Sequence, residues 1–149
     1  MDRDPADLSG EMLLVEPRPV PAGPVVVSVC ISCKAADGSG AVVGPDMFDA
    51  LNAAFGDGDA AIMVRPVQCL SVCKRPATVA VTSPDGYTFL FGDLQTDSGS
   101  AALVSFVESY QKADYGLVPW RERAEVLRKG MVARVPPMRW SPEDGRAPK

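Results

Sequence analysis

Apolar residues along this chain of 149 residues form short strand-like runs and longer helix-like stripes. Residues 25–29, a β-branched run, predict a buried strand, and residues 61–67 predict a second strand. Between them, Pro45 suits the first turn of a helix. Apolar residues follow it at helical spacing and predict the buried stripe of that helix: Met47, Phe48, Leu51, Ala54 and Phe55.

The pattern then predicts a hairpin. Residues 77–81 and 87–91 are apolar and β-branched or aromatic runs, so each predicts a strand. Pro84-Asp85-Gly86 lies between them and is a strong turn signal. We therefore expect these two strands to pair in antiparallel fashion.

Two helices are predicted after the hairpin. Ser100 or a neighbour is expected to cap the first, and a shorter helix is expected from Trp120 to about Lys129, with Gly130 as its stop. The first helix has an apolar face made by Leu103, Phe106, Val107 and Tyr110.

This order of elements predicts an α/β protein with a thioredoxin-like fold. The expected architecture is a parallel βαβ unit with a right-handed crossover, then a β-hairpin and helix, in a four-stranded mixed sheet with a short C-terminal helix. We expect one domain over residues 24–135, with a flexible N-terminal arm at 1–23 and a Pro-rich C-terminal tail at 136–149.

Charge and composition narrow the range of partners. The net charge of −4 argues against nucleic acid as a partner. Basic residues gather over residues 119–139, which are the one candidate for a charged docking face, although a solvated helix with arginines lying along its surface is favoured. A basic start and an uninterrupted apolar region are both missing at the N-terminus, and no apolar run could span a bilayer. We therefore expect a cytoplasmic protein that does not enter membranes.

Four cysteines and no histidine restrict the chemistry most. Cys30 and Cys33 form one close pair, Cys69 and Cys73 form a second, and each pair follows a strand of the predicted parallel unit. Because the carboxyl ends of neighbouring parallel strands meet at one edge of a sheet, we expect the two pairs to lie together. In a reducing cytosol such pairs are more often metal ligands or redox-active thiols than structural disulfides.

Three interpretations of the cysteines follow. Four thiolates suit a [2Fe–2S] cluster or a single Zn²⁺ ion, and the lack of histidine excludes mixed cysteine–histidine sites and histidine-dependent nucleophiles. Alternatively, Cys30 and Cys33 are the dithiol of a thioredoxin-like thiol–disulfide oxidoreductase, a possibility supported by Pro76, which lies where thioredoxins place a cis-proline. Residues 34–44 separate Cys33 from the predicted helix, which weakens the dithiol interpretation. The residues alone leave all three open.

Several segments resemble a known pattern. Residues 69–76, Cys-Leu-Ser-Val-Cys-Lys-Arg-Pro, are the most specific, and residues 29–33, 87–93 and 120–137 extend the likeness. Together they resemble a bacterial family of small predicted metal-binding proteins of unknown function. That family is similar in turn to the thioredoxin-like [2Fe–2S] ferredoxins. The resemblance covers about residues 25–137.

The resemblance implies that Cys30, Cys33, Cys69 and Cys73 bind a [2Fe–2S] cluster in a one-electron carrier rather than an enzyme. It also implies a homodimer, a redox partner protein, and a role near cobalamin synthesis or metal handling. The short spacing between Cys30 and Cys33 departs from these ferredoxins, whose first two cysteines are further apart, so a four-cysteine Zn²⁺ protein or metal carrier stays as the alternative.

Three cations lie next to the cysteines in sequence. Lys34, Lys74 and Arg75 are either charges that stabilise a reduced cluster or solvent-facing loop residues, and the sequence favours neither.

Overall fold

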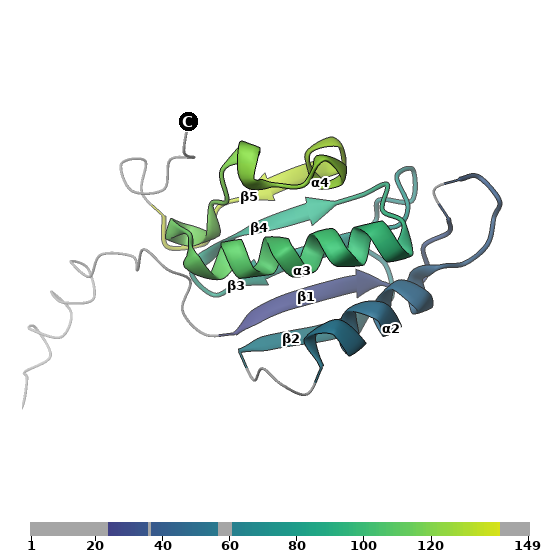
Figure 1. Ribbon diagram of the computed structural model, residues 1–149, viewed down its shortest axis with the longest axis horizontal. Helices are drawn as coiled ribbons and strands as arrows, with labels where there is room; N and C mark the ends of the chain where they lie inside the picture. Colours follow the sequence, from purple (N-terminus) through teal and green to yellow (C-terminus); the bar gives the residue numbers. More distant parts are fainter. Residues whose placement is uncertain (1–23, 36, 57–60, 141–149) are drawn as a thin grey trace, which may run out of the picture.

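The computed structural model describes residues 24–35, 37–56 and 61–140. Its strands form one mixed sheet in the order β2-β1-β3-β4-β5 (Figure 1). The strands are β1 (Val25–Cys30), β2 (Ile62–Val67), β3 (Val79–Ser83), β4 (Gly86–Phe91) and β5 (Met131–Val135). β1 and β2 are parallel, and every other neighbouring pair is antiparallel. The parallel βαβ unit followed by an antiparallel hairpin confirms the predicted thioredoxin-like fold.

The fifth strand is a difference from the predicted four-stranded sheet. β5 follows Gly130 and pairs with β4, for example through Leu90 and Ala133. It is an edge strand, and its side chains are half-buried or exposed, so it lacks the apolar run that marks a buried strand. Pro136 and Pro137, which cannot donate to a sheet ladder, follow it directly.

Two helices, α2 (Gly44–Phe55) and α3 (Thr96–Lys112), cover one face of the sheet (Figure 1). The predicted stripe of α2 is packed into the core except for Ala54, which is exposed. The predicted face of α3 is buried throughout. α3 begins at Thr96, however, so Ser100 is not its cap; the Ser100 hydroxyl instead donates to the carbonyl of Asp97 within the first turn, at 3.1 Å.

The predicted helix from Trp120 to Lys129 is interrupted. A single 3₁₀ turn, η2 (Trp120–Glu122), precedes a short α4 (Glu125–Lys129), and another 3₁₀ turn, η1 (Asp114–Gly116), follows α3. Arg123 separates η2 from α4 in an extended conformation, and its buried side chain donates from Nε to the carbonyl of Val118 at 3.2 Å.

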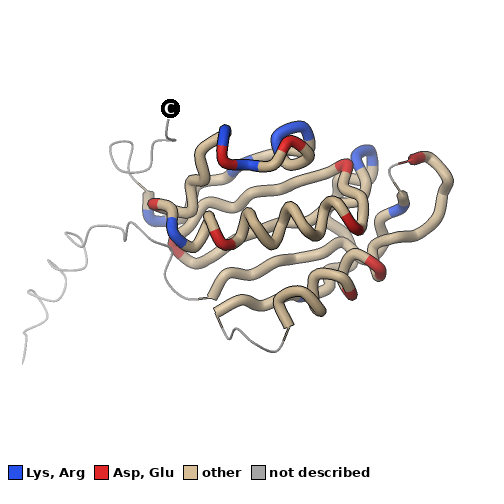
Figure 2. The backbone as a smooth tube through the Cα atoms, viewed as in Figure 1, with Lys and Arg blue, Asp and Glu red and all other residues tan. Residues whose placement is uncertain are grey.

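The basic segment is largely occupied by contacts within the chain. The Arg128 guanidinium lies 4.6 Å from the centre of the Trp120 ring, and Lys129 pairs with Glu125 at 2.9 Å. Acidic and basic residues are interspersed around α4 (Figure 2). These contacts agree with arginines lying along a solvated surface.

The predicted N-terminal arm and most of the predicted tail lie outside the described residues. Within the part of the chain that is described, no helix combines the length and the apolar character needed to cross a bilayer.

Candidate metal centre

The two cysteine segments begin at the same edge of the sheet. Cys30 ends β1 and is in register with Val67, which ends β2. Beyond the strands, the Ile31 N–H donates to the Val67 carbonyl at 2.9 Å, and the Ser32 hydroxyl donates to the Gln68 carbonyl at 2.7 Å. The expectation that the two pairs meet at the carboxyl ends of neighbouring strands therefore holds for the backbone.

The four thiols differ in their surroundings. All are free; Cys30 and Cys33 are buried, whereas Cys69 and Cys73 are exposed. Cys30, Cys33 and Cys73 line one cavity of about 550 Å³, and Cys69 is not among its lining residues. Among the described residues, no three cysteine or acidic side chains are grouped closely enough to hold a metal ion. The structure thus brings three thiols to one cavity without assembling a complete four-thiolate site.

The start of α2 lies directly against the first pair. After Cys33 the chain makes an excursion over residues 34–43 and returns, so that the N–H groups of Val43 and Gly44 both donate to the Cys33 carbonyl, at 2.9 and 3.1 Å. The prediction that residues 34–44 separate the helix from Cys33 was therefore wrong, although the N–H groups at the start of α2 bind a carbonyl of the cysteine segment and not a thiol. Nothing in the sequence of residues 34–43 indicates that Val43 and Gly44 return to the Cys33 carbonyl.

Gly44 makes this approach possible. A Cβ atom at this position would overlap the carbonyl oxygen of Cys30 and the backbone of Ile31, with the Ile31 Cα only 2.6 Å away. Only glycine lets the first turn of α2 pack on the backbone of the cysteine segment at this distance.

Cys30 and Cys33 have opposite pKa shifts. Burial opposes ionisation of Cys30, but hydrogen bonds from the side chains of Ser32 and Cys33 and from the backbone N–H of Leu70 outweigh it and lower its pKa to about 7. Burial raises the pKa of Cys33, and the neighbouring Cys30 adds to this, while Thr78 partly opposes it. The pair therefore loses its first proton mainly from Cys30.

We expect the alkylation rate of Cys30 by iodoacetamide to rise through about pH 7, because the thiolate is the reactive form. Cys33→Ala removes a donor to that thiolate, so the midpoint should move to higher pH. The Ser32 hydroxyl also reaches the nearer Gln68 carbonyl, which makes Cys33 the cleaner donor to remove. Mass spectrometry of the Cys30 peptide measures the rate, with Ser100→Ala as the control. Equal midpoints in wild type and Cys33→Ala would contradict the assigned cause.

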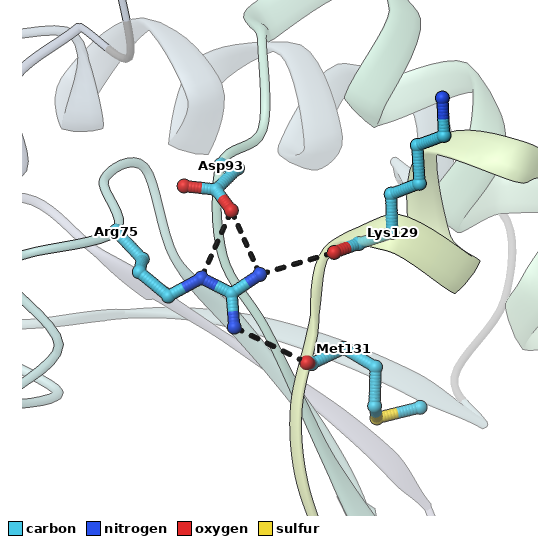
Figure 3. Close-up of polar contacts among 4 residues, drawn as sticks. All are labelled: Arg75, Asp93, Lys129 and Met131. Carbon is cyan, nitrogen blue, oxygen red and sulfur yellow. Dashed lines mark hydrogen bonds and ion pairs between the residues drawn. The ribbon is translucent and has the colours of Figure 1, made fainter.

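Arg75 does not serve as a charge for the cysteines. Its Nε and Nη2 donate to one carboxylate oxygen of Asp93, at 2.9 and 2.7 Å, while Nη1 reaches the Met131 carbonyl at 3.3 Å and Nη2 the Lys129 carbonyl at 3.0 Å (Figure 3). The hypothesis that Arg75 stabilises a reduced cluster is therefore replaced by a structural role. Lys34, in contrast, lines the cysteine cavity.

Pro76 lies just before β3, as expected. Among the described residues the cis peptide bond joins Pro76 to Ala77, so Pro76 precedes this bond instead of following it. The backbone of Ala77 also exchanges hydrogen bonds with Leu94, at 3.5 and 3.2 Å.

Fold and site together define a thioredoxin-like α/β protein with four free cysteines at the carboxyl edge of β1 and β2. The chain belongs to the family described as "Protein of unknown function (DUF1636)", which matches residues 27–137. The resemblance to a family of unknown function is therefore confirmed.

Two solved structures are similar to this chain. One is the wild-type thioredoxin-like [2Fe–2S] ferredoxin from Aquifex aeolicus, with 19% identity, a TM-score of 0.48, and coverage of 75% of this chain and 99% of that chain. The other is also described as a thioredoxin-like [2Fe–2S] ferredoxin from Aquifex aeolicus, with 17% identity, a TM-score of 0.49, and coverage of 80% and 100%. A comparison with curated proteins found no match.

Proposed function

We propose that this protein binds a [2Fe–2S] cluster through Cys30, Cys33, Cys69 and Cys73 and acts as a one-electron carrier. The observation that supports this most is the joining of the two cysteine segments at one sheet edge, where Cys30, Cys33 and Cys73 line the same cavity. Cys69 lies four residues before Cys73 on the same loop, so it is close in sequence to that cavity.

The donor set fits such a centre. All four side chains are free thiols, and all-cysteine ligation is typical of [2Fe–2S] clusters. A single Zn²⁺ ion requires four sulfurs about 2.3 Å from one point. In the described residues no three thiols converge in this way. A [2Fe–2S] cluster would take two of the four thiolates at each of its two iron atoms, and the cysteines occur in the sequence as two close pairs. When bound, the cluster would accept and release one electron with no need for an acid, a base or a substrate pocket.

Residues of the chain favour the thiolate of Cys30, while Thr78 only partly offsets the raised pKa of Cys33. A thiol must lose its proton to bind a metal, and hydrogen bonds to the sulfur favour the charged form. Cys30 contacts the Ser32 hydroxyl at 3.5 Å, and Cys33 contacts the Thr78 hydroxyl at 3.3 Å. Lys34 is one of the residues that line the cavity, and a positive charge there would offset the negative charge of four thiolates.

Spectroscopy on protein purified without air tests this proposal. We expect a brown protein with about two iron and two sulfide per chain, visible absorption bands, and a paramagnetic signal after one-electron reduction. If the assay finds zinc and no sulfide, the protein is a four-cysteine zinc protein or metal carrier and not an electron carrier. A colourless chain that cannot be reconstituted with iron and sulfide would contradict metal binding altogether.

A second function, thiol–disulfide exchange, is favoured by one specific observation. Cys30 has a pKa lowered to about 7, lies beside the buried Cys33, and is close to the start of α2. In that reaction the Cys30 thiolate would attack a substrate disulfide and form a mixed disulfide. Cys33 would then displace the second substrate thiol and leave a Cys30–Cys33 disulfide.

The proposed carrier needs a redox partner protein. We extend the proposal to the oligomeric state, a homodimer, and to the location, the cytoplasm. The role that we propose is in cobalamin synthesis or metal handling. The four free thiols are consistent with a reducing compartment.

A further inference from the structure

Arg75 is fixed to the protein through its backbone as well as its side chain. Its N–H donates to the Val72 carbonyl at 3.0 Å, and its own carbonyl accepts from the Asp93 N–H at 2.9 Å. Gly92 packs against it, because a Cβ there would lie 2.6 Å from the Arg75 carbonyl oxygen. Backbone and guanidinium together join Arg75 to the end of β4 and to the turn between α4 and β5 (Figure 3).

These contacts define the position of Cys73. The hydrogen bond from Arg75 N–H to the Val72 carbonyl closes a turn whose two central residues are Cys73 and Lys74. At the other end of the loop, Gln68 is held by the Ser32 hydroxyl. The loop between Gln68 and Arg75 is thus attached at both ends. Arg75 makes more of these contacts than Gln68, and Cys73 is two residues from it.

We propose that Arg75 is a positioning residue that holds Cys73 at the cysteine cavity by anchoring its turn to Asp93 and to the main-chain carbonyls of Lys129 and Met131. This inference rests on the proposed function, because it assigns Cys73 as a ligand. α4 and β5 follow the βαβ unit and the hairpin in the chain, whereas the cysteines follow β1 and β2. The guanidinium of Arg75 binds the carbonyls of Lys129, at the end of α4, and Met131, at the start of β5, and its backbone N–H closes the turn that contains Cys73.

A contribution to overall stability does not explain this arrangement well. The Arg75 and Asp93 side chains are 36% and 47% exposed, and ion pairs with such exposure contribute little to folding. Residues that orient a metal ligand act differently, because their loss typically lowers metal affinity by about 10- to 100-fold. Arg75 should therefore affect metal binding far more than melting temperature.

The test titrates Co²⁺, as a probe of thiolate ligation, into the full reduced chain and follows the thiolate-to-metal absorption. We expect Arg75→Gln to weaken Co²⁺ binding about 10- to 100-fold, with a melting temperature of the metal-free chain close to wild type. Arg75→Lys should also weaken binding, because an ammonium group cannot reproduce the fork that spans Asp93 and two carbonyls. Arg128→Gln is the control: it also removes one arginine charge, but from a side chain that does not contact the Cys73 loop. It should bind Co²⁺ like wild type.

Amide hydrogen exchange on the same metal-free variants gives an independent readout. Arg75→Gln should accelerate exchange over residues 72–75 at least fivefold, whereas Arg128→Gln should not. Co²⁺ affinity of Arg75→Gln within twofold of wild type, or unchanged exchange over these residues, would overturn the inference. Wild-type protein that shows no thiolate absorption with Co²⁺, or with iron and sulfide, contradicts the proposed function instead. In that case the exchange measurement still decides whether Arg75 holds the turn.

Discussion

Cys73→Ser is expected to abolish the visible absorption of the metal-loaded protein and its stabilisation by metal. Cys73 lines the cavity with Cys30 and Cys33, so its loss leaves a centre without a thiolate that the proposed ligation requires. A ligand at 100 times its dissociation constant stabilises a fold by about 2.7 kcal/mol. Wild type should therefore melt about 5–10 °C higher with metal, and Cys73→Ser should show no such rise.

Lys74→Gln is the matched control, because Lys74 is exposed on the same loop and has no proposed role as ligand. It should keep both the colour and the metal-dependent rise in melting temperature. Full colour and an unchanged rise in Cys73→Ser would exclude Cys73 as a ligand. Insulin reduction tests the second function. Loss of activity in Cys30→Ser with full activity in Cys73→Ser would favour the dithiol, whereas equal loss in both variants would favour the metal centre.

Gly44→Ala is expected to cause the largest loss of stability among single-methyl changes near the site. The added Cβ would overlap the backbone of Cys30 and Ile31, and backbone cannot move aside as a flexible side chain can. Overpacking of this kind costs about 1–3 kcal/mol. We expect a loss near the upper end of this range in urea denaturation, together with a higher pKa of Cys30 as the cysteine segment shifts.

Asn52→Ala provides the comparison on the same helix. The Asn52 side chain is exposed on α2, so its replacement by a good helix former should change stability by less than about 0.5 kcal/mol. A Gly44→Ala protein as stable as Asn52→Ala would show that the start of α2 does not need its close packing on the cysteine segment.

Much of the fold follows from local patterns. The run Val25–Cys30 is almost completely buried because it is a central strand, and its β-branched residues predict this. The stripe of Met47, Leu51 and Phe55 lies at helical spacing and packs into the core as expected. Parallel pairing of β1 with β2 also follows, since a helix connects them. These features depend on residues close to one another in the chain.

The parts that could not be predicted depend on contacts between distant segments. Arg75 binds Asp93, Lys129 and Met131, which lie 18 to 56 residues away, and nothing in the local sequence specifies these partners. Asp93 is the last residue of segment 87–93, one of the segments that resemble the family, and this was the one sign in the sequence that Asp93 matters. Cys69, by contrast, is outside the lining of the cavity although its loop is local: the Ser71 N–H donates to the Cys69 sulfur, only two residues away, at 3.2 Å.

The excursion over residues 34–43 has a consequence for engineering. The chain departs from Cys33 and comes back to the same carbonyl through the N–H groups of Val43 and Gly44. Gly38 and Gly40 line the cysteine cavity, and the exposed Ser39 lies between them, so a reporter dye attached at Ser39 would sit beside the thiols. Lys34 at the cavity and Val43 against Cys30 and Cys33 would keep their places.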